Sequence, residues 1–155
     1  MPHKCLLKQG VAHLVGSGLD VEFMFTQRRH GIQVDIKVNT DVQKLSEKGF
    51  PYHIHEAPVS TDCASTKKHL DSFNRNPDGS DPAYKCNPNA PELCEQGDLS
   101  GKHSVLKGDV NTYTYMEYNL PHLKNLYGTT SVVIHLPNAN KTRLACATIQ
   151  DKHPK

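Results

Sequence analysis

Two histidines one residue apart, His53 and His55 in the stretch FPYHIHEAPV, are the part of the sequence best suited to hold a metal ion. Side chains alternate between the two faces of a strand, so residues i and i+2 point the same way and two imidazoles there can share one ion. The pair alone is ambiguous, because two surface imidazoles on one strand face would have the same spacing. Imidazole ligands suit copper, zinc, iron and nickel, so the spacing does not choose the metal.

Two further histidines strengthen the metal interpretation. His69 lies in STKKHLDSFN, where the alternative is a solvated loop histidine beside two lysines. His135 interrupts the apolar stretch SVVIHL without a packing reason, and the alternative is a core histidine satisfied by hydrogen bonds. The other histidines have no paired spacing and are interpreted as surface or structural residues. They are His3, His13, His30, His103, His122 and His153.

Composition limits the classes of protein to which the chain can belong. Its 155 residues favour one domain with one core. A formal charge of +2, from 18 basic and 16 acidic residues without a Lys/Arg run, argues against a nucleic-acid-binding surface. No apolar run approaches the roughly 18 residues that span a bilayer, and the start, MPHKCLLKQG, lacks the apolar stretch of a signal peptide. We therefore expect either a cytosolic protein or a chain that begins after a removed leader.

Cysteine usage helps to decide between these two locations. None of the five cysteines belongs to a C-x-x-C pair, so a zinc ribbon or a thioredoxin-type site is not expected. Two disulfides and one spare thiol fit the count, which favours an oxidising compartment. The sequon NKT predicts a glycan on Asn140 and points the same way. The cysteines are Cys5, Cys63, Cys86, Cys94 and Cys146.

Hydrophobic patterning predicts an all-β domain. Residues 20–26 and 32–38 alternate with period two, as half-buried strands do, and RRHG between them predicts a hairpin turn. A first strand is expected within residues 5–15, with Gly10 as a bulge or bend. Further strands are expected near residues 50–57, 103–108, 112–120, 131–136 and 143–150.

A long irregular segment separates the two halves of this pattern. Residues 57–101 have little periodicity and much Pro, Asn, Asp and Gly, and a loop of this length is usually functional or pinned down. Three of the cysteines and His69 lie inside it. The single helical candidate is DVQKLSEKG, closed by Gly49. About eight short strands without a strong helix predict an antiparallel sandwich or barrel.

Five motifs together carry a resemblance to a known family. In chain order they are FPYHIHEAPV, DCASTKKHLDSFN, GDLSGKH, SVVIHL and TRLACATI. The residues of these motifs and their order along the chain resemble the copper/zinc superoxide dismutase superfamily over about residues 5–150. The resemblance implies an eight-stranded antiparallel Greek-key barrel or sandwich with a long disulfide-tied loop, as one domain over residues 1–155.

The resemblance also implies roles for particular residues. Cys63 and Cys146 match the disulfide that ties the long loop to the last strand, and Arg143 matches the arginine that guides superoxide to copper. The histidines that match the copper ligands are His53, His55, His69 and His135.

Two departures from the zinc-containing members are informative. No histidine lies between His69 and Gly97, and Glu95 stands where the last zinc histidine is expected. Asp98 matches the zinc aspartate, but His69 and Asp98 alone cannot complete a tetrahedral zinc site. Only LPNANKT separates His135 from the arginine, where zinc-containing members carry a long charged loop. The chain therefore resembles the secreted or surface-anchored copper-only enzymes of fungi and related microbes, and zinc is expected to be absent.

The remaining cysteines have two possible arrangements. Cys86 and Cys94 would form a small local disulfide that stiffens the segment that zinc otherwise organises. The alternative is that one of them pairs with Cys5. The local bridge is preferred, and it leaves Cys5 as a spare thiol buried in the first strand.

The expected function is that of an extracellular superoxide dismutase. Superoxide would be converted to dioxygen and hydrogen peroxide while copper alternates between Cu(II) and Cu(I). His69 is predicted to release copper on reduction and to pass on a proton. A ligating histidine is normally fixed through its second nitrogen, for which Glu95 is the first choice and Asp98 the second.

Other expectations follow from the same resemblance. Copper-only relatives imply a monomer, and loss of the charged loop implies weaker long-range guidance of superoxide. Two other functions remain open: a copper-binding or copper-buffering protein without turnover, and a structural or adhesive surface domain. Retention of Arg143 and of all four matching histidines favours the enzyme.

Overall fold

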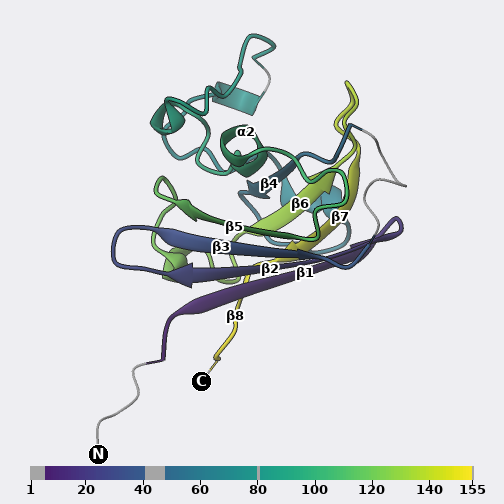
Figure 1. Ribbon diagram of the computed structural model, residues 1–155. Coiled ribbons are helices and arrows are strands. Elements are labelled where there is room, and N and C mark those ends of the chain that lie inside the picture. Colours follow the sequence, from purple (N-terminus) through teal and green to yellow (C-terminus); the bar gives the residue numbers. More distant parts are fainter. Residues whose placement is uncertain (1–5, 41–47, 80, 155) are drawn as a thin grey trace, which may run out of the picture.

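Two antiparallel sheets enclose a single hydrophobic core in the computed structural model, which describes residues 6–40, 48–79 and 81–154 (Figure 1). The larger sheet has the order β5 (Thr112–Glu117), β3 (Ile32–Val38), β2 (Leu19–Gln27), β1 (Gln9–Gly16), β8 (Gln150–Asp151). The smaller sheet has the order β4 (Tyr52–His55), β6 (Ser131–His135), β7 (Arg143–Thr148). The expected all-β sandwich is confirmed, but the two sheets do not close into a barrel.

Period-two patterning forms the larger sheet. Buried and partly exposed residues alternate along β1, β2 and β3, which places apolar side chains on the core face of the sheet. The predicted hairpin of β2 and β3 is present, and its turn is closed where the Arg28 N–H donates to the Gly31 carbonyl at 2.8 Å. Phe23 and Phe25 on β2 are almost completely buried. Each such side chain contributes about 1.5–3 kcal/mol on burial.

The smaller sheet is buried throughout β4 and β6, and both strands carry histidines. Their partners in the pairing are apolar or small residues, so His53 lies opposite Val133 and His55 lies opposite Ser131. Continuous burial of a strand hides its alternation, which explains why SVVIHL reads as an apolar run with one histidine.

Gly10 corrects one expectation. It was predicted to form a bulge or bend, but the pairing of β1 with β2 is continuous through it. A Cβ atom at this position would lie 3.1 Å from both Ile149 and Tyr127. The glycine is therefore explained by close packing of side chains against the strand.

Two further expectations are changed by the structure. Residues 103–108 were predicted as a strand, but only a bridge between Phe50 and Leu106 is present there. The chain just before it forms the short helix α2 (Leu99–His103). The predicted helix over residues 41–49 falls mostly outside the described residues, as does Cys5.

The long segment after β4 contains the 3-10 turns η1 (Cys63–Thr66), η2 (Pro77–Gly79) and η3 (Pro91–Leu93). A fourth turn, η4 (Leu123–Asn125), lies between β5 and β6. No helix in the described part of the chain is both long and apolar enough to cross a membrane.

Gly97 holds the far end of this long segment against β4. The Ile54 N–H donates to the Gly97 carbonyl, and the Gly97 N–H donates to the Leu70 carbonyl, each at 2.9 Å. A Cβ atom on Gly97 would collide with the Ile54 carbonyl oxygen. Only glycine permits this approach, which brings the chain on either side of residue 97 next to the histidines of β4.

Candidate metal centre

Four histidines from three parts of the chain meet at the edge of the smaller sheet. His53 and His55 come from β4, His135 from β6, and His69 from the long loop, where it forms a bridge with His55. One ring nitrogen from each lies within 4.8 Å of the others. Among the described residues, this is the one group of three or more His, Cys, Asp or Glu side chains close enough to hold a metal ion.

Backbone carbonyls fix two of the rings. The Nδ1–H of His55 donates to the Lys67 carbonyl and that of His135 to the Lys141 carbonyl, each at 2.9 Å. Both rings therefore direct Nε2 inward, and these two nitrogens lie 3.2 Å apart. Such contacts set the tautomer and the orientation of a ligating ring.

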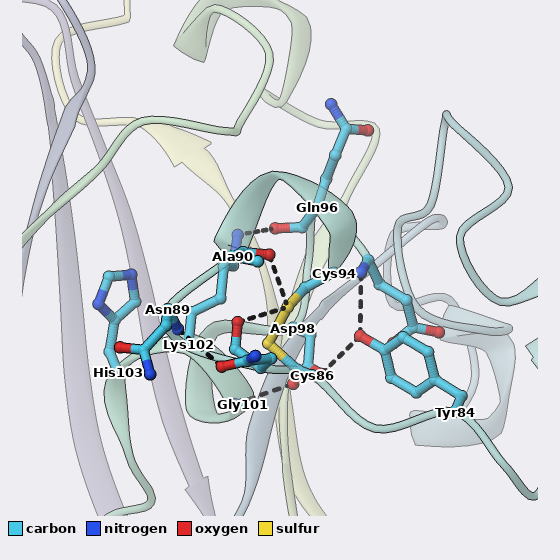
Figure 2. Close-up of a disulfide and its surroundings, with 12 residues drawn as sticks. Tyr84, Cys86, Asn89, Ala90, Cys94, Gln96, Asp98, Gly101, Lys102 and His103 are labelled. Atoms are coloured by element: carbon cyan, nitrogen blue, oxygen red, sulfur yellow. Dashed lines mark hydrogen bonds between the residues drawn. A yellow bond between two sulfur atoms is a disulfide. The ribbon is translucent and has the colours of Figure 1, made fainter.

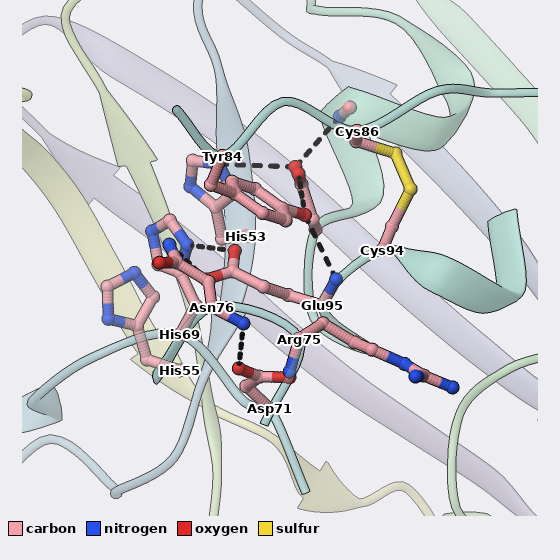
Figure 3. Close-up of polar contacts among 12 residues, drawn as sticks. His53, His55, His69, Asp71, Arg75, Asn76, Tyr84, Cys86, Cys94 and Glu95 are labelled. Atoms are coloured by element: carbon pink, nitrogen blue, oxygen red, sulfur yellow. Dashed lines mark hydrogen bonds and ion pairs between the residues drawn. A yellow bond between two sulfur atoms is a disulfide. The ribbon is translucent and has the colours of Figure 1, made fainter. Parts of the chain in front are cut away.

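Carboxylates face the other two rings (Figure 3). The Nδ1–H of His69 donates to Glu95 Oε1 at 2.7 Å, which again leaves Nε2 free to bind an ion. The ring of His53 has the opposite arrangement, with Nε2 3.5 Å from Asp98 Oδ1. Its Nδ1 is buried without a hydrogen-bond partner. A buried polar atom without a partner is costly, and a bound ion at the centre would meet this nitrogen.

Burial favours the uncharged form of three of the four rings. It lowers the pKa of His53 well below its ordinary value, the pKa of His55 to about 2 and the pKa of His135 to about 4. Mutual repulsion between the imidazoles adds to the shift for each ring. A neutral imidazole has a free lone pair, so these three rings can each offer a nitrogen to a copper ion.

Glu95 is a buried carboxylate with two partners. Only 1% of the residue is exposed, and its second oxygen accepts from Asn76 Nδ2 at 3.1 Å (Figure 3). Asn76 is held in turn by Asp71, which accepts from the Asn76 backbone N–H. No local pattern in the sequence marks Asn76, because its contact with Glu95 spans 19 positions of irregular chain.

Asp98 contacts a different histidine from Glu95. It caps α2 by accepting from the Gly101 N–H at 2.9 Å, and it accepts from the hydroxyl of Tyr84 at 2.8 Å. Glu95 is thus the carboxylate in contact with His69, while Asp98 faces His53. From the sequence, Glu95 and Asp98 were the first and second choices for the partner of His69. In the structure each carboxylate lies beside a different histidine.

Arg143 lies at the start of β7, and its guanidinium is held by three acceptors in the η1 turn. It donates to the Cys63 carbonyl at 2.8 Å and to the Thr66 hydroxyl and the Lys67 carbonyl at 2.6 Å. The Lys67 carbonyl also accepts from His55, so one peptide group joins the arginine to the histidine centre.

Both preferred disulfides are present. Cys63–Cys146 ties η1 to β7, and Cys86–Cys94 closes a small ring in the long loop (Figure 2). The first bridge anchors the turn that holds Arg143. The second precedes Glu95 directly and fixes the start of the segment that carries both carboxylates.

A polar pocket of about 240 Å³ opens onto the histidines. Its basic lining comes from Arg143 and from two exposed lysines, Lys68 and Lys141. Asn140 also lines it and is exposed. A positively charged approach of this kind favours a small anion over a neutral or cationic ligand.

The antiparallel β-sandwich, the four-histidine centre, the loop disulfide and the nearby arginine together agree with the class that the sequence resembles, the superoxide dismutases. No family model matches the chain. The chain is 42% identical over 105 residues to the cell surface Cu-only superoxide dismutase of Arthroderma benhamiae, covering 62% of this chain and 26% of that protein. It is 32% identical over 140 residues to cell surface Cu-only superoxide dismutase 5 of Candida albicans, covering 86% of this chain and 55% of that protein.

Solved structures agree with the sequence comparison. Candida albicans superoxide dismutase 5 in its Cu(II) form matches with a TM-score of 0.73 and 25% identity, covering 97% of this chain and 95% of that chain. The chain belongs to the copper/zinc superoxide dismutase superfamily and is a relative of its cell-surface copper-only members. It spans about a quarter to about half of the length of these two curated relatives.

Proposed function

We propose that the chain is a copper-only superoxide dismutase domain that converts superoxide to dioxygen and hydrogen peroxide without zinc. The observation that carries the proposal is the asymmetry of the histidine centre, in which one ring rests on a buried carboxylate beside a basic pocket. Copper bound at this centre would take an electron from one superoxide ion and return it to a second. The remaining steps concern protons and charge, which the chain's own residues manage.

His69 is the proposed proton carrier. Its side chain is 16% exposed and it lines the basic pocket, so solvent protons and oxygen species can reach it. When His69 Nε2 holds a proton, Glu95 compensates the positive ring through Nδ1. Release of that proton to the reduced oxygen species, with a second proton from solvent, completes hydrogen peroxide.

Glu95 is the proposed positioning residue for His69, and Asp98 the one for His53. A carboxylate on the second nitrogen fixes the orientation of a ring and raises its basicity. The solved variants of the Candida albicans enzyme change a glutamate to alanine and an aspartate three positions later to asparagine. Glu95 and Asp98 are likewise a glutamate and an aspartate three positions apart, which supports a role for this pair at the metal centre.

Arg143 is the proposed substrate guide. Its three fixed contacts keep the guanidinium beside the pocket, where a rigid positive fork suits a small anion. Lys68 and Lys141 add positive charge at short range. Guidance is therefore local, in place of the long charged loop that this chain lacks.

One experiment separates the enzyme from a copper-binding or copper-buffering protein. The purified domain is loaded with copper, its metal content is measured, and the removal of superoxide is followed by stopped-flow spectroscopy. We expect about one copper per chain, no zinc and rapid turnover, with His135→Ala as the control that loses the centre. A domain that binds copper stoichiometrically but leaves superoxide untouched would favour the buffering function.

The proposed setting is the extracellular space or the cell surface. Two disulfides suit an oxidising compartment, and the two curated relatives above are named as cell-surface proteins. We further propose a single-domain monomer with a glycan on the exposed Asn140. Intact mass before and after deglycosylation tests the glycan, and light scattering tests the monomer.

A further inference from the structure

The short segment from Glu95 to Asp98 carries both carboxylates that face the histidines, and it has no regular secondary structure until α2 begins. Irregular backbone does not hold side chains to a fraction of an ångström by itself. The disulfide at Cys94 and the contacts of Gly97 fix its two ends. Neither of these contacts reaches Asp98 Oδ2 or the Glu95 N–H, and the Gly101 N–H holds only Asp98 Oδ1.

The hydroxyl of Tyr84 contacts both of these atoms (Figure 2). It donates to Asp98 Oδ2 at 2.8 Å and accepts from the Glu95 backbone N–H at 2.9 Å. Burial raises the pKa of Tyr84 and the neighbouring Asp98 charge raises it further, so the hydroxyl keeps its proton and remains a donor. One oxygen atom therefore links the residue that orients His69 to the residue that faces His53.

A buried ammonium supports the middle of the same segment (Figure 2). Lys102 Nζ donates to the Gln96 carbonyl at 2.8 Å. The same ammonium pairs with Glu117 on β5 at 2.6 Å. Only 1% of each charged side chain is exposed. The segment is thus tied to the larger sheet at Gln96. If the Tyr84 contacts changed, the loop would stay in place, and only the two carboxylates would move relative to the histidines.

We propose that Tyr84 is a positioning residue of the metal centre, because its hydroxyl joins the Glu95 backbone N–H to the Asp98 carboxylate. Through these carboxylates it orients the rings of His69 and His53. The proposal deepens the proposed function and rests on it for the kinetic effect only.

Tyr84→Phe tests the proposal, since it removes the hydroxyl and leaves the ring. We expect full copper loading, a changed Cu(II) electron paramagnetic resonance spectrum and a turnover about tenfold slower, the size of one hydrogen bond to a charged group. The pH profile of turnover should shift, because the ring of His69 would no longer be held in register with Glu95. The Glu95 amide should exchange its hydrogen faster in the metal-free protein.

Tyr113→Phe is the matched control. The Tyr113 hydroxyl also accepts from one backbone N–H and donates to one acceptor, both of Lys107, at the outer edge of the larger sheet. We expect this variant to lose a similar amount of stability with an unchanged Cu(II) spectrum and pH profile. Equal spectra and pH profiles for wild type and Tyr84→Phe would overturn the proposal, whatever the change in stability.

Failure of the proposed function is distinguishable from failure of this inference. If copper-loaded wild type does not remove superoxide, the Cu(II) spectrum and the Glu95 amide exchange still report on the Tyr84 contacts. A changed spectrum with faster exchange would then support positioning at a copper-binding centre. An unchanged spectrum with unchanged exchange would overturn it there as well.

Discussion

The two halves of the histidine centre are held in different ways. His55 and His135 rest on backbone carbonyls of Lys67 and Lys141, whereas His69 and His53 face the carboxylates of Glu95 and Asp98. A carbonyl is neutral and fixed in the chain, so it holds a ring in one state. A carboxylate is charged and can compensate a ring that gains a proton, so it suits a ligand that changes state during turnover.

His69 is also more exposed to solvent than the two rings held by carbonyls. Among the rings of the centre it has the more open position, with 16% of its side chain exposed, while His55 and His135 are 1% and 2% exposed as residues. His53 combines both features, because it faces a carboxylate and is buried. The comparison therefore predicts permanent ligands at His55 and His135 and a mobile proton carrier at His69.

Removal of one ring from each half should have the largest effects on copper content and turnover. His135→Ala should lose copper and activity together, because it removes a permanent nitrogen from the centre. His69→Ala should retain copper on the other three rings but lose most turnover. Metal analysis and stopped-flow kinetics on the same preparations check this. If both variants lose copper equally, the distinction between the two halves is wrong.

Glu95→Gln should remove the charge that faces His69 and leave the two carbonyl-held rings unchanged. The amide keeps the shape of the side chain but cannot compensate a protonated His69, so turnover should fall by about 10- to 100-fold while copper stays bound. Asp98→Asn is the matched variant, and it should change the environment of His53 with a smaller effect on the pH profile. Unchanged kinetics for Glu95→Gln would remove it from the proposed mechanism.

Three buried rings, those of His53, His55 and His135, should dominate the pH dependence of stability in the metal-free domain. The pKa of His55 is lowered by burial to about 2 and that of His135 to about 4, whereas an unfolded histidine titrates at about 6.5. The unfolded chain therefore binds more protons below pH 6.5, and stability falls as the pH is lowered from there towards 4. The slope is up to about 1.4 kcal/mol per pH unit for each such ring.

Urea unfolding of the metal-free domain at a series of pH values measures this slope. His135→Gln supplies the control, because it removes one titrating ring and should flatten the dependence. A free energy of unfolding that stays constant between pH 6.5 and pH 4 would contradict neutral, buried rings.

The smallest expected effect comes from the charge beside the carbonyl that holds His135. Lys141→Ala removes a positive side chain from the pocket but keeps the carbonyl in place. We expect the rate with superoxide at low ionic strength to fall a few-fold, with copper content and Cu(II) spectrum unchanged. Lys124→Ala, at an exposed lysine on η4 outside this pocket, should leave the rate as it is. A rate that does not depend on Lys141 would place guidance on Arg143 alone.

The sequence was sufficient for most of the sheet and for the four histidines that the structure brings together. Alternation predicted β2 and β3 and their hairpin, because a half-buried strand repeats every two residues. Residues 57–101 were read as irregular and a strand was expected over residues 103–108, but Leu99–His103 forms α2, since Asp98 provides a cap that local alternation does not reveal. Gly10 was read as a bend because a glycine in a strand does not show what packs against it.

The chain by itself determined which side chains can bind a metal, because residue type and strand periodicity place His53 and His55 on one face. Through the resemblance to the copper/zinc superfamily it also predicted a site without zinc, since no histidine lies between His69 and Gly97. Only the tertiary structure decided which nitrogen of each ring points inward, since that depends on carbonyls and carboxylates far away in sequence. The same holds for the choice of Glu95 over Asp98 as the contact of His69 and for the contacts of Tyr84, because hydrogen bonds across an irregular loop leave no period in the sequence.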